Sequence, residues 1–251
     1  MSSSRAVLVT GGSRGIGRVI ARSFAERGDR VAVHYGSSRE QAEEVLAGLP
    51  GSGHALVQAD MADAEAVAAM VDSAASALGG LDVLVNNAGV FMASPPLEAS
   101  YEEWQRVWSR TLAVNLVGAA NATFRAVPHL QAAGGGAVVN VTSRGAFRGE
   151  PDTPAYGASK AGLNSFAQSM ALALAPHGIS VTCVAPGFVQ TEMARDVLDG
   201  ERGDAVRAQS PFGRVARPEE VASAVVWLAS PEARFSSGTI VDVNGASYLR
   251  S

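Results

Sequence analysis

The sequence predicts an α/β protein with one parallel sheet of about seven strands and helices on both of its faces. Three observations predict it: short aliphatic runs alternate with amphipathic stretches, the connections between them are short, and a glycine-rich turn follows the first run. Strands that alternate with helices form a parallel sheet covered on both faces. No linker, repeat or low-complexity segment interrupts the pattern, so we expect a single domain over residues 1–251.

The elements follow one another in a regular order. Residues 6–9 form an aliphatic run typical of a buried strand, and apolar residues at three- and four-residue steps over 18–25 predict the first helix. The same two patterns then alternate, with strands predicted over 31–35, 55–58, 81–85, 137–142, 179–184 and 239–243, and helices over 39–49, 64–78, 101–130, 156–175 and 218–228. This is the order of a Rossmann-type doubly wound sheet, in which ligands bind beyond the carboxyl ends of the strands.

The composition excludes several classes of function. A formal charge of −4 without any lysine- or arginine-rich run argues against a general nucleic-acid binder. Cys183 is the single cysteine, and the four histidines show no H-x-x-x-H spacing, so we expect no disulfide and no metal site. No apolar run reaches the roughly 18 residues of a membrane span, and residues 1–5 leave no room for a signal peptide. We expect a soluble, cytoplasmic protein without a membrane partner.

The stretch TGGSRGIG, residues 10–17, lies between the first strand and the first helix. Glycines at such a turn bring bare backbone N–H groups close to a phosphate, and the N-terminus of the helix favours its negative charge. Glycines also serve plain tight turns, so the turn by itself leaves both interpretations open.

A second group of candidate residues follows the fifth predicted strand. Tyr156 and Lys160 are four residues apart on a predicted helix and share one face. An ammonium near a phenol lowers the tyrosine pKa and suits proton exchange with an alcohol or ketone oxygen. Ser143 lies at the end of the strand, where its hydroxyl would hold such an oxygen. Taken alone, the pair is more often an ordinary exposed pair, and the serine a turn residue.

Two asparagine positions complete the pattern. Residues 86–89, NNAG, end the fourth strand, where they either admit a flat ring and tie neighbouring strands or form a simple turn. Asn115 lies within a long helical stretch although asparagine is a mediocre helix former. It either faces solvent or serves a local bend.

In order and spacing, these pieces resemble the short-chain dehydrogenase/reductase family over nearly the whole chain. The pieces are TGGSRGIG, Asp60, NNAG, Asn115, Ser143, the Y-x-x-x-K of Tyr156 and Lys160, and the segment 186–191. Within the family, the pattern is most similar to 3-oxoacyl-[acyl-carrier-protein] reductases. The resemblance implies an oxidoreductase that transfers hydride between a nicotinamide and a CH–OH or C=O group.

The resemblance also implies a catalytic tetrad of Asn115, Ser143, Tyr156 and Lys160. In reduction, Tyr156 would protonate the carbonyl oxygen that Ser143 orients and polarises. Lys160 would bind the nicotinamide ribose and lower the Tyr156 pKa. Asn115 would hold a water that links Lys160 to solvent.

The resemblance further implies how a dinucleotide is bound. The glycine turn would wrap the diphosphate, Asp60 would bind the adenine amino group, and 186–191 would cover the nicotinamide. Met61 stands where valine often follows the aspartate, a mild departure from the family. The residues expected to bind the cofactor are Gly11, Ser13, Arg14, Gly15, Ile16, Gly17, Ser37, Asp60, Met61, Asn87, Ala88, Gly89, Tyr156, Lys160, Pro186, Gly187, Val189 and Thr191.

NADP is expected in preference to NAD. Relatives that prefer NAD carry an acidic residue at about Tyr35, and here the nearest acid is Glu40. Arg14 lies in the glycine turn, well placed for a phosphate dianion, with Ser37 or Arg39 to assist. The alternative for Arg14 is a solvated turn residue.

The sequence leaves the substrate open. Residues 90–96, 144–152 and 192–212 are expected to shape a pocket with apolar and basic walls, which fits a ketone with an anionic or phosphopantetheine-linked tail, although the arginines there fit a solvent-facing role as well. A 3-oxoacyl-type carbonyl reductase is the first expectation, and an alcohol, sugar or polyketide-type dehydrogenase is the alternative. A non-catalytic dinucleotide sensor is a further alternative, although both Tyr156 and Lys160 are intact. The family implies a homotetramer, with a dimer as the alternative.

Overall fold

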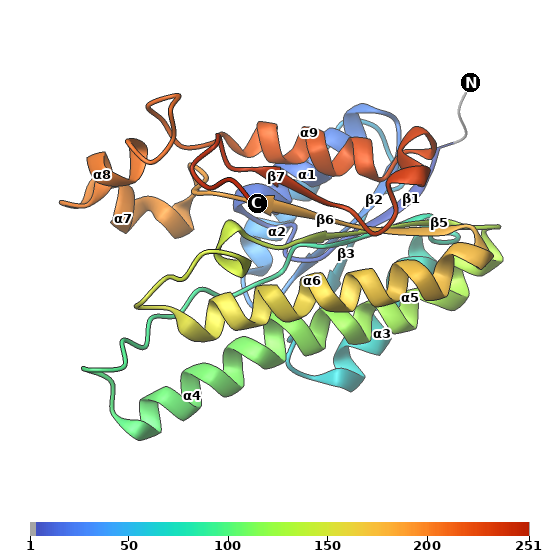
Figure 1. Ribbon diagram of the computed structural model, residues 1–251. Coiled ribbons are helices and arrows are strands. Elements are labelled where there is room, and N and C mark those ends of the chain that lie inside the picture. The colour runs from blue at the N-terminus through green and yellow to red at the C-terminus, as the bar shows by residue number, and fades with distance from the viewer. Residues whose placement is uncertain (1–3, 251) are drawn as a thin grey trace.

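The computed structural model describes residues 4–250 and is built on a seven-stranded sheet of order β3-β2-β1-β4-β5-β6-β7 (Figure 1). Every neighbouring pair of strands is parallel, which confirms the predicted fold class. The strands are β1 (Ala6–Val9), β2 (Arg30–Tyr35), β3 (Ala55–Gln58), β4 (Val83–Asn86), β5 (Gly136–Val141), β6 (Ile179–Pro186) and β7 (Ile240–Val243).

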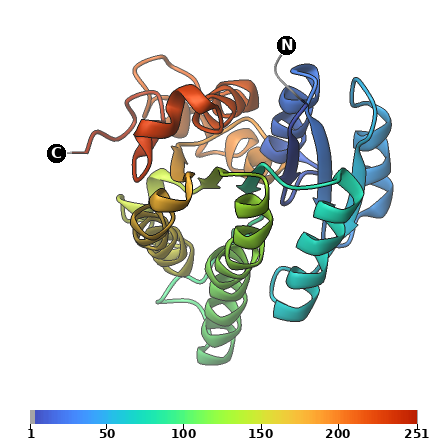
Figure 2. The same cartoon turned by 90° about the vertical axis from the view of Figure 1, so that its right-hand side faces the viewer.

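Helices cover both faces of the sheet (Figure 2). On one face lie α1 (Gly15–Glu26), α2 (Arg39–Ala47) and α9 (Pro218–Leu228), and on the other α3 (Ala64–Leu78), α4 (Tyr101–Leu112), α5 (Ala119–Ala132) and α6 (Pro154–Leu174). Side chains of a strand alternate between faces, so Leu8 packs into one core while Val7 and Val9 pack into the other. Because both faces of the sheet are buried, each strand appears in the sequence as a mostly continuous apolar run.

Two parts of the chain differ from the prediction. The single helix expected over 101–130 is α4 and α5 joined by a π-helical segment, η1 (Ala113–Gly118). The stretch 192–212, hereafter the lid segment, contains two short helices that were not predicted, α7 (Arg195–Asp199) and α8 (Gly203–Arg207). Five residues are too few to show a helical period, and a π-helical turn leaves the apolar pattern nearly unchanged.

Short 3₁₀ turns complete the chain between these elements. They are η2 (Arg144–Ala146), η3 (Ala175–His177), η4 (Glu192–Ala194) and η5 (Pro231–Ser236). Side-chain caps fix where two helices begin: Asp63 accepts from the backbone at the start of α3, and Ser100 does so at the start of α4.

The strand order reverses between β1 and β4, and this sets the place of the site. The chain turns toward one face after β1 and toward the other after β4, so their carboxyl ends open a crevice. The ends of β5 and β6 lie at the same edge, below the lid segment (Figure 1).

Candidate active site

One cavity of about 810 Å³ occupies this edge of the sheet. It extends from Ser37 and Asp60 beside β2 and β3 to Tyr156 and Phe188 beside β5 and β6. Every residue expected to bind the cofactor lines it, as do Ser143, Tyr156 and Lys160, whereas Asn115 does not. The structure therefore gathers residues that lie up to 180 positions apart in the chain, from Gly11 to Thr191.

The glycine turn is held in a conformation that side chains would prevent. Gly11 has φ +62° and Gly15 φ +53°, in the left-handed region. A Cβ on Gly17 would lie 2.1 Å from the carbonyl oxygen of Gly11, so the turn and α1 meet backbone to backbone. The Asn87 side chain donates to the carbonyls of Thr10 at 3.0 Å and Gly11 at 3.1 Å, tying β4 to the turn as the sequence predicts.

His34 supports the same turn, and the sequence reasoning missed it. The Gly11 N–H donates to His34 Nδ1 at 2.9 Å, and His34 Nε2 lies 3.1 Å from the carbonyl oxygen of Ala59. These partners fit a neutral ring with its proton on Nε2. Burial lowers the His34 pKa, against a smaller opposing effect of the Ala59 carbonyl, so the ring stays neutral. A histidine within an otherwise aliphatic strand was the signal available in the sequence.

At the opposite end from Tyr156, Asp60 is engaged by a residue that was not predicted. Its Oδ2 accepts from Arg110 Nη1 at 2.9 Å, and its Oδ1 accepts from the Ala62 N–H at 3.0 Å. These hydrogen bonds, that of Arg110 first, lower the Asp60 pKa. Arg110 reaches the cavity from α4 and adds a positive charge there.

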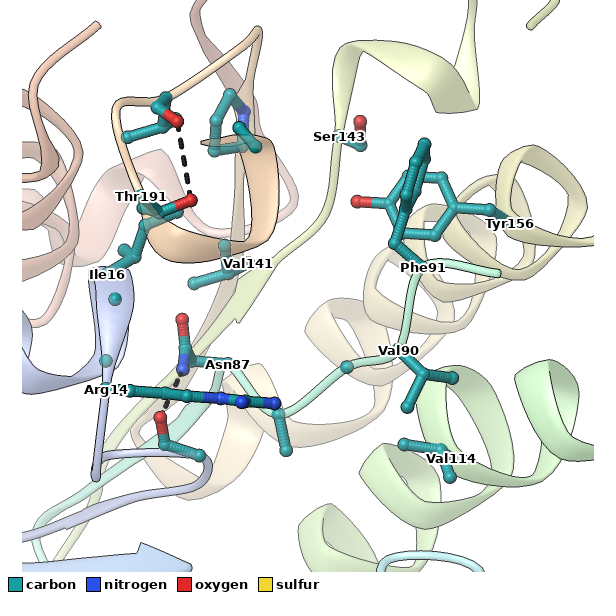
Figure 3. Close-up of a pocket in the computed structure, with 18 of the residues that line it drawn as sticks. Arg14, Ile16, Asn87, Val90, Phe91, Val114, Val141, Ser143, Tyr156 and Thr191 are labelled. Atoms are coloured by element: carbon teal, nitrogen blue, oxygen red, sulfur yellow. Dashed lines mark hydrogen bonds between the residues drawn. The ribbon is translucent and has the colours of Figure 1, made fainter. Parts of the chain in front are cut away.

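The groups expected to select the cofactor lie in the glycine turn after β1 and in the loop after β2. Arg14 and Ser37 line the cavity, and the Arg14 side chain extends across it beside Asn87 (Figure 3). Arg39 instead pairs with Glu43 at 2.7 Å on the exposed side of α2. The acids that line the cavity among the described residues are Asp60, Glu150 and Glu192.

Ser143 and Tyr156 lie next to each other on the cavity wall, with their hydroxyl oxygens toward the same space (Figure 3). Tyr156 and Lys160 project from one face of α6, and the Lys160 Nζ lies 5.8 Å from the Tyr156 ring centroid. The ammonium donates to the carbonyl oxygen of Val141 at 2.9 Å, which fixes its position at the end of β5.

Burial controls the protonation of both groups. It lowers the pKa of Lys160 to about 8. It raises the pKa of Tyr156, and the hydrogen bond with Ser143 opposes this only in part. The lowered tyrosine pKa that we expected from Lys160 is therefore not found, because burial disfavours the charged phenolate.

Asn115 is fully buried in η1 and acts on the protein itself. Its Nδ2 donates to the Val90 carbonyl at 3.0 Å and to Ser159 Oγ at 3.1 Å, and its Oδ1 accepts from the Val90 N–H at 2.8 Å. Of the two interpretations that the sequence left open, the structure shows the local irregularity of the helix. These three contacts fix the side chain, and the water that links Lys160 to solvent through Asn115 stays a prediction.

The end of the cavity beside Tyr156 is partly apolar and partly charged. The Phe91 ring packs edge-on against Tyr156 at 4.9 Å between centroids (Figure 3). Arg144 lines the cavity, whereas Arg148 and Phe147, which the sequence grouped with it, do not. Further residues that line the cavity from the segments after β4, β5 and β6 include Met92, Gly145, Glu150, Phe188, Glu192, Ala194 and Val197.

Comparison with known proteins places this site in a family. A family model described as enoyl-(acyl carrier protein) reductase matches residues 11–246. The 3-oxoacyl-[acyl-carrier-protein] reductase FabG of Staphylococcus aureus is 38% identical over 251 residues, which cover 99% of this chain and 100% of that protein. The chain belongs to the short-chain dehydrogenase/reductase family. The resemblance inferred from the sequence is thus confirmed.

Other members of the family show how widely its substrates vary. The cis-4-hydroxycyclohexanecarboxylate dehydrogenase of Sinomonas cyclohexanicum is 40% identical, over 96% of this chain and 95% of that protein. A short chain dehydrogenase from Burkholderia cenocepacia, solved in complex with NADP, superposes with a TM-score of 0.87 at 37% identity, covering 97% of each chain. The present protein is therefore an oxidoreductase acting on CH–OH or C=O groups, and its substrate has to be argued from its own cavity.

Two further observations concern partners. Within residues 4–250, no helix combines the length and apolar character needed to cross a membrane. The same residues contain no group of three or more histidine, cysteine, aspartate or glutamate side chains arranged to hold a metal ion.

Proposed function

We propose that this protein is an NADPH-dependent carbonyl reductase that converts a ketone, of the 3-oxoacyl type in the first place, to a secondary alcohol. The observation that supports this most directly is the presence of Ser143, Tyr156 and Lys160 in the same cavity as the glycine turn. The cavity then binds the cofactor and the ketone side by side. The turn holds the cofactor phosphates, and Ser143 and Tyr156 orient and protonate the ketone.

The residues of the cavity fit a dinucleotide from end to end. The exposed N–H groups of the turn and the start of α1 would hold the diphosphate. Asp60 would bind the adenine amino group through an oxygen that Arg110 orients. When bound, NADPH supplies the hydride of the reduction.

The 2′-phosphate of NADPH has suitable partners in the glycine turn and after β2. Arg14 and Ser37 line this part of the cavity, and Tyr35 occupies the place where an acid would repel the phosphate. The guanidinium offers several N–H donors to a phosphate dianion, so we expect tighter binding of NADPH than of NADH.

Tyr156 would supply the proton. Because burial raises its pKa, the phenol remains protonated at neutral pH and can donate to a carbonyl oxygen that Ser143 polarises. As the alcohol O–H forms, the phenol O–H breaks and a phenolate remains. The ammonium of Lys160, on the same face of α6, would stabilise that phenolate until it is reprotonated.

The apolar wall of the cavity and one cation on it suit two classes of substrate. Phe91, Met92 and Val197 suit an acyl chain, in keeping with the similarity to FabG of Staphylococcus aureus. A second candidate is a ketone or alcohol that carries a carboxylate, as in the name of the Sinomonas cyclohexanicum relative, and Arg144 on the cavity wall favours it.

The experiment that tests this function follows absorbance of the reduced nicotinamide with NADPH or NADH and a panel of ketones. The panel contains acetoacetyl thioesters, diketones, quinones and keto sugars. Oxidation of NADPH that is abolished by Tyr156→Phe, with cofactor binding retained, is the expected result. Tight NADPH binding without turnover of any ketone or alcohol would contradict the proposal and support a sensor role. Tighter binding of NADH than of NADPH would contradict the cofactor preference alone.

A further inference from the structure

Arg144 is a buried cation beside the proposed reaction centre. It follows Ser143 directly, is 3% exposed, and contributes to the wall of the cavity that contains Tyr156. A guanidinium in this position is costly to desolvate unless its N–H groups are hydrogen-bonded and its charge is balanced. Its contacts therefore indicate what the cavity is built to receive.

The hydrogen bonds of Arg144 go largely to uncharged groups. Nη1 donates to Gln209 Oε1 at 2.8 Å and to Ser247 Oγ at 2.9 Å, and Nη2 donates to Glu150 Oε1 at 3.1 Å. The guanidinium also lies 5.3 Å from the centroid of the Phe188 ring. Residues from four places in the chain, Glu150, Phe188, Gln209 and Ser247, thus meet on one side chain.

A second guanidinium shares one of these partners. Arg148 Nη1 donates to the same Gln209 Oε1 at 3.0 Å, so a neutral amide oxygen lies between two cations. Within residues 4–250, Glu150 is the one carboxylate bonded to either guanidinium. This cluster therefore holds two positive charges and one negative charge, and it still favours oxygen acceptors.

The hydrogen-bond partners of Arg144 are only half-buried: Glu150, Gln209 and Ser247 are each partly exposed. Gln209 belongs to the lid segment, and the Glu150 side chain is 28% exposed. Burial lowers the pKa of Arg144, while Glu150 opposes this, so the existing partners balance the charge only in part. An oxygen that enters the cavity can replace one of them.

We propose that Arg144 is a specificity-determining residue that donates hydrogen bonds to a second acceptor oxygen of the substrate, while Tyr156 and Ser143 hold the reacting carbonyl oxygen. The inference rests on the proposed carbonyl reductase function and narrows its substrate class. In a 3-oxoacyl thioester the second acceptor is the thioester carbonyl, and in a keto acid it is the carboxylate. A ketone without a second oxygen makes no such contact.

The test compares kcat/KM for three ketones in the wild type and in Arg144→Met. The ketones are the acetoacetyl thioester of N-acetylcysteamine, acetoacetate, and 2-pentanone, which has no second oxygen. We expect the ratios of the first two to 2-pentanone to fall about 10- to 100-fold in the variant, as for loss of a hydrogen bond to a charged group. Ratios cancel any loss that the substitution imposes on all three ketones.

A fall in the ratio for acetoacetate alone would identify a carboxylate as the recognised group, and a fall in the ratio for the thioester alone would identify a carbonyl.

Two other variants make the test specific. Arg148→Met loses the same Gln209 contact but does not alter the cavity wall, so both ratios stay as in the wild type. Glu150→Gln removes the competing carboxylate and raises the ratio for acetoacetate. If Arg144→Met fails to fold, Arg144→Lys keeps the charge without the planar fork and lowers both ratios. If an Arg144 variant still reduces 2-pentanone and both ratios are unchanged, the role of Arg144 is overturned and the proposed function stands. If the wild type reduces no ketone at all, the proposed function is overturned too.

Discussion

The buried position of Lys160 suits the proposed chemistry but lowers the stability of the fold. Lys160 is 4% exposed, and burial lowers its pKa from 10.5 to about 8. A base whose pKa is lower in the folded state destabilises that state wherever the unfolded chain is protonated. The group therefore weakens the fold at neutral pH, and this cost falls as the pH rises.

The consequence is a measurable dependence of stability on pH. Between pH 8 and 10.5 the unfolded chain carries a proton at Lys160 that the folded protein has lost, so the free energy of unfolding gains about 3 kcal/mol over this range. Denaturant unfolding of the wild type should show this gain relative to Lys160→Met. Cys183, whose pKa burial raises to about 12, is present in both proteins and largely cancels in the comparison. A difference that does not change with pH would contradict the prediction.

His34 gives a second prediction for a single residue. In His34→Phe the Gly11 N–H loses its acceptor beside the cofactor cavity, and we expect the Kd for NADPH to rise about tenfold. His34→Asn retains an acceptor and should recover part of the affinity. Fluorescence titration measures both, with thermal unfolding of the cofactor-free variants as the control for stability. Equal affinities in all three proteins would show that the turn keeps its shape without His34.

Among the elements, the π-helical segment η1 has the clearest structural role. Asn115→Ala removes three hydrogen bonds and leaves the Val90 N–H and carbonyl without their partner, so we expect a loss of about 2 to 4 kcal/mol in the free energy of unfolding. We also expect lower activity, because Gly89 and Val90 lie on the cavity wall. Asn121→Ala in α5, whose side chain has no hydrogen bond within residues 4–250, is the matched control. Equal losses in the two variants would contradict this role.

The bounds of helices and strands were predicted best where the hydrophobic pattern is regular and ends at a clear turn. β1, β3, α3 and α9 begin and end at the predicted residues, because aliphatic runs and helical periods there stop at clear turn residues. β4 starts two residues later than predicted, because Leu81 is fully buried without belonging to the strand. Burial and strand pairing are different properties, and an aliphatic run reports the first of them.

At the scale of the whole molecule, exposed apolar side chains support assembly. Phe124 on α5 is 78% exposed and Leu172 on α6 is 82% exposed, and the two helices cover the same face of the sheet (Figure 2). Apolar side chains that face solvent on these two helices suit the homotetramer that the family resemblance implies. We predict a homotetramer that Phe124→Glu combined with Leu172→Glu converts to smaller species, measured by light scattering after gel filtration. A monomeric wild type would contradict it.

The sequence by itself determined the fold class and singled out many of the residues that line the cavity, among them the glycine turn, Ser143, Tyr156 and Lys160. These depend on local signals: the periods of strands and helices, and turn residues at the ends of strands. Only the tertiary structure decided the partners of those residues. Asp60 meets Arg110, Gly11 meets His34, and Arg144 meets Gln209 across separations of 23 to 65 residues. It also reversed the expected direction of the Tyr156 pKa. Pairing and desolvation depend on which distant segments pack together, and a local pattern does not contain that information.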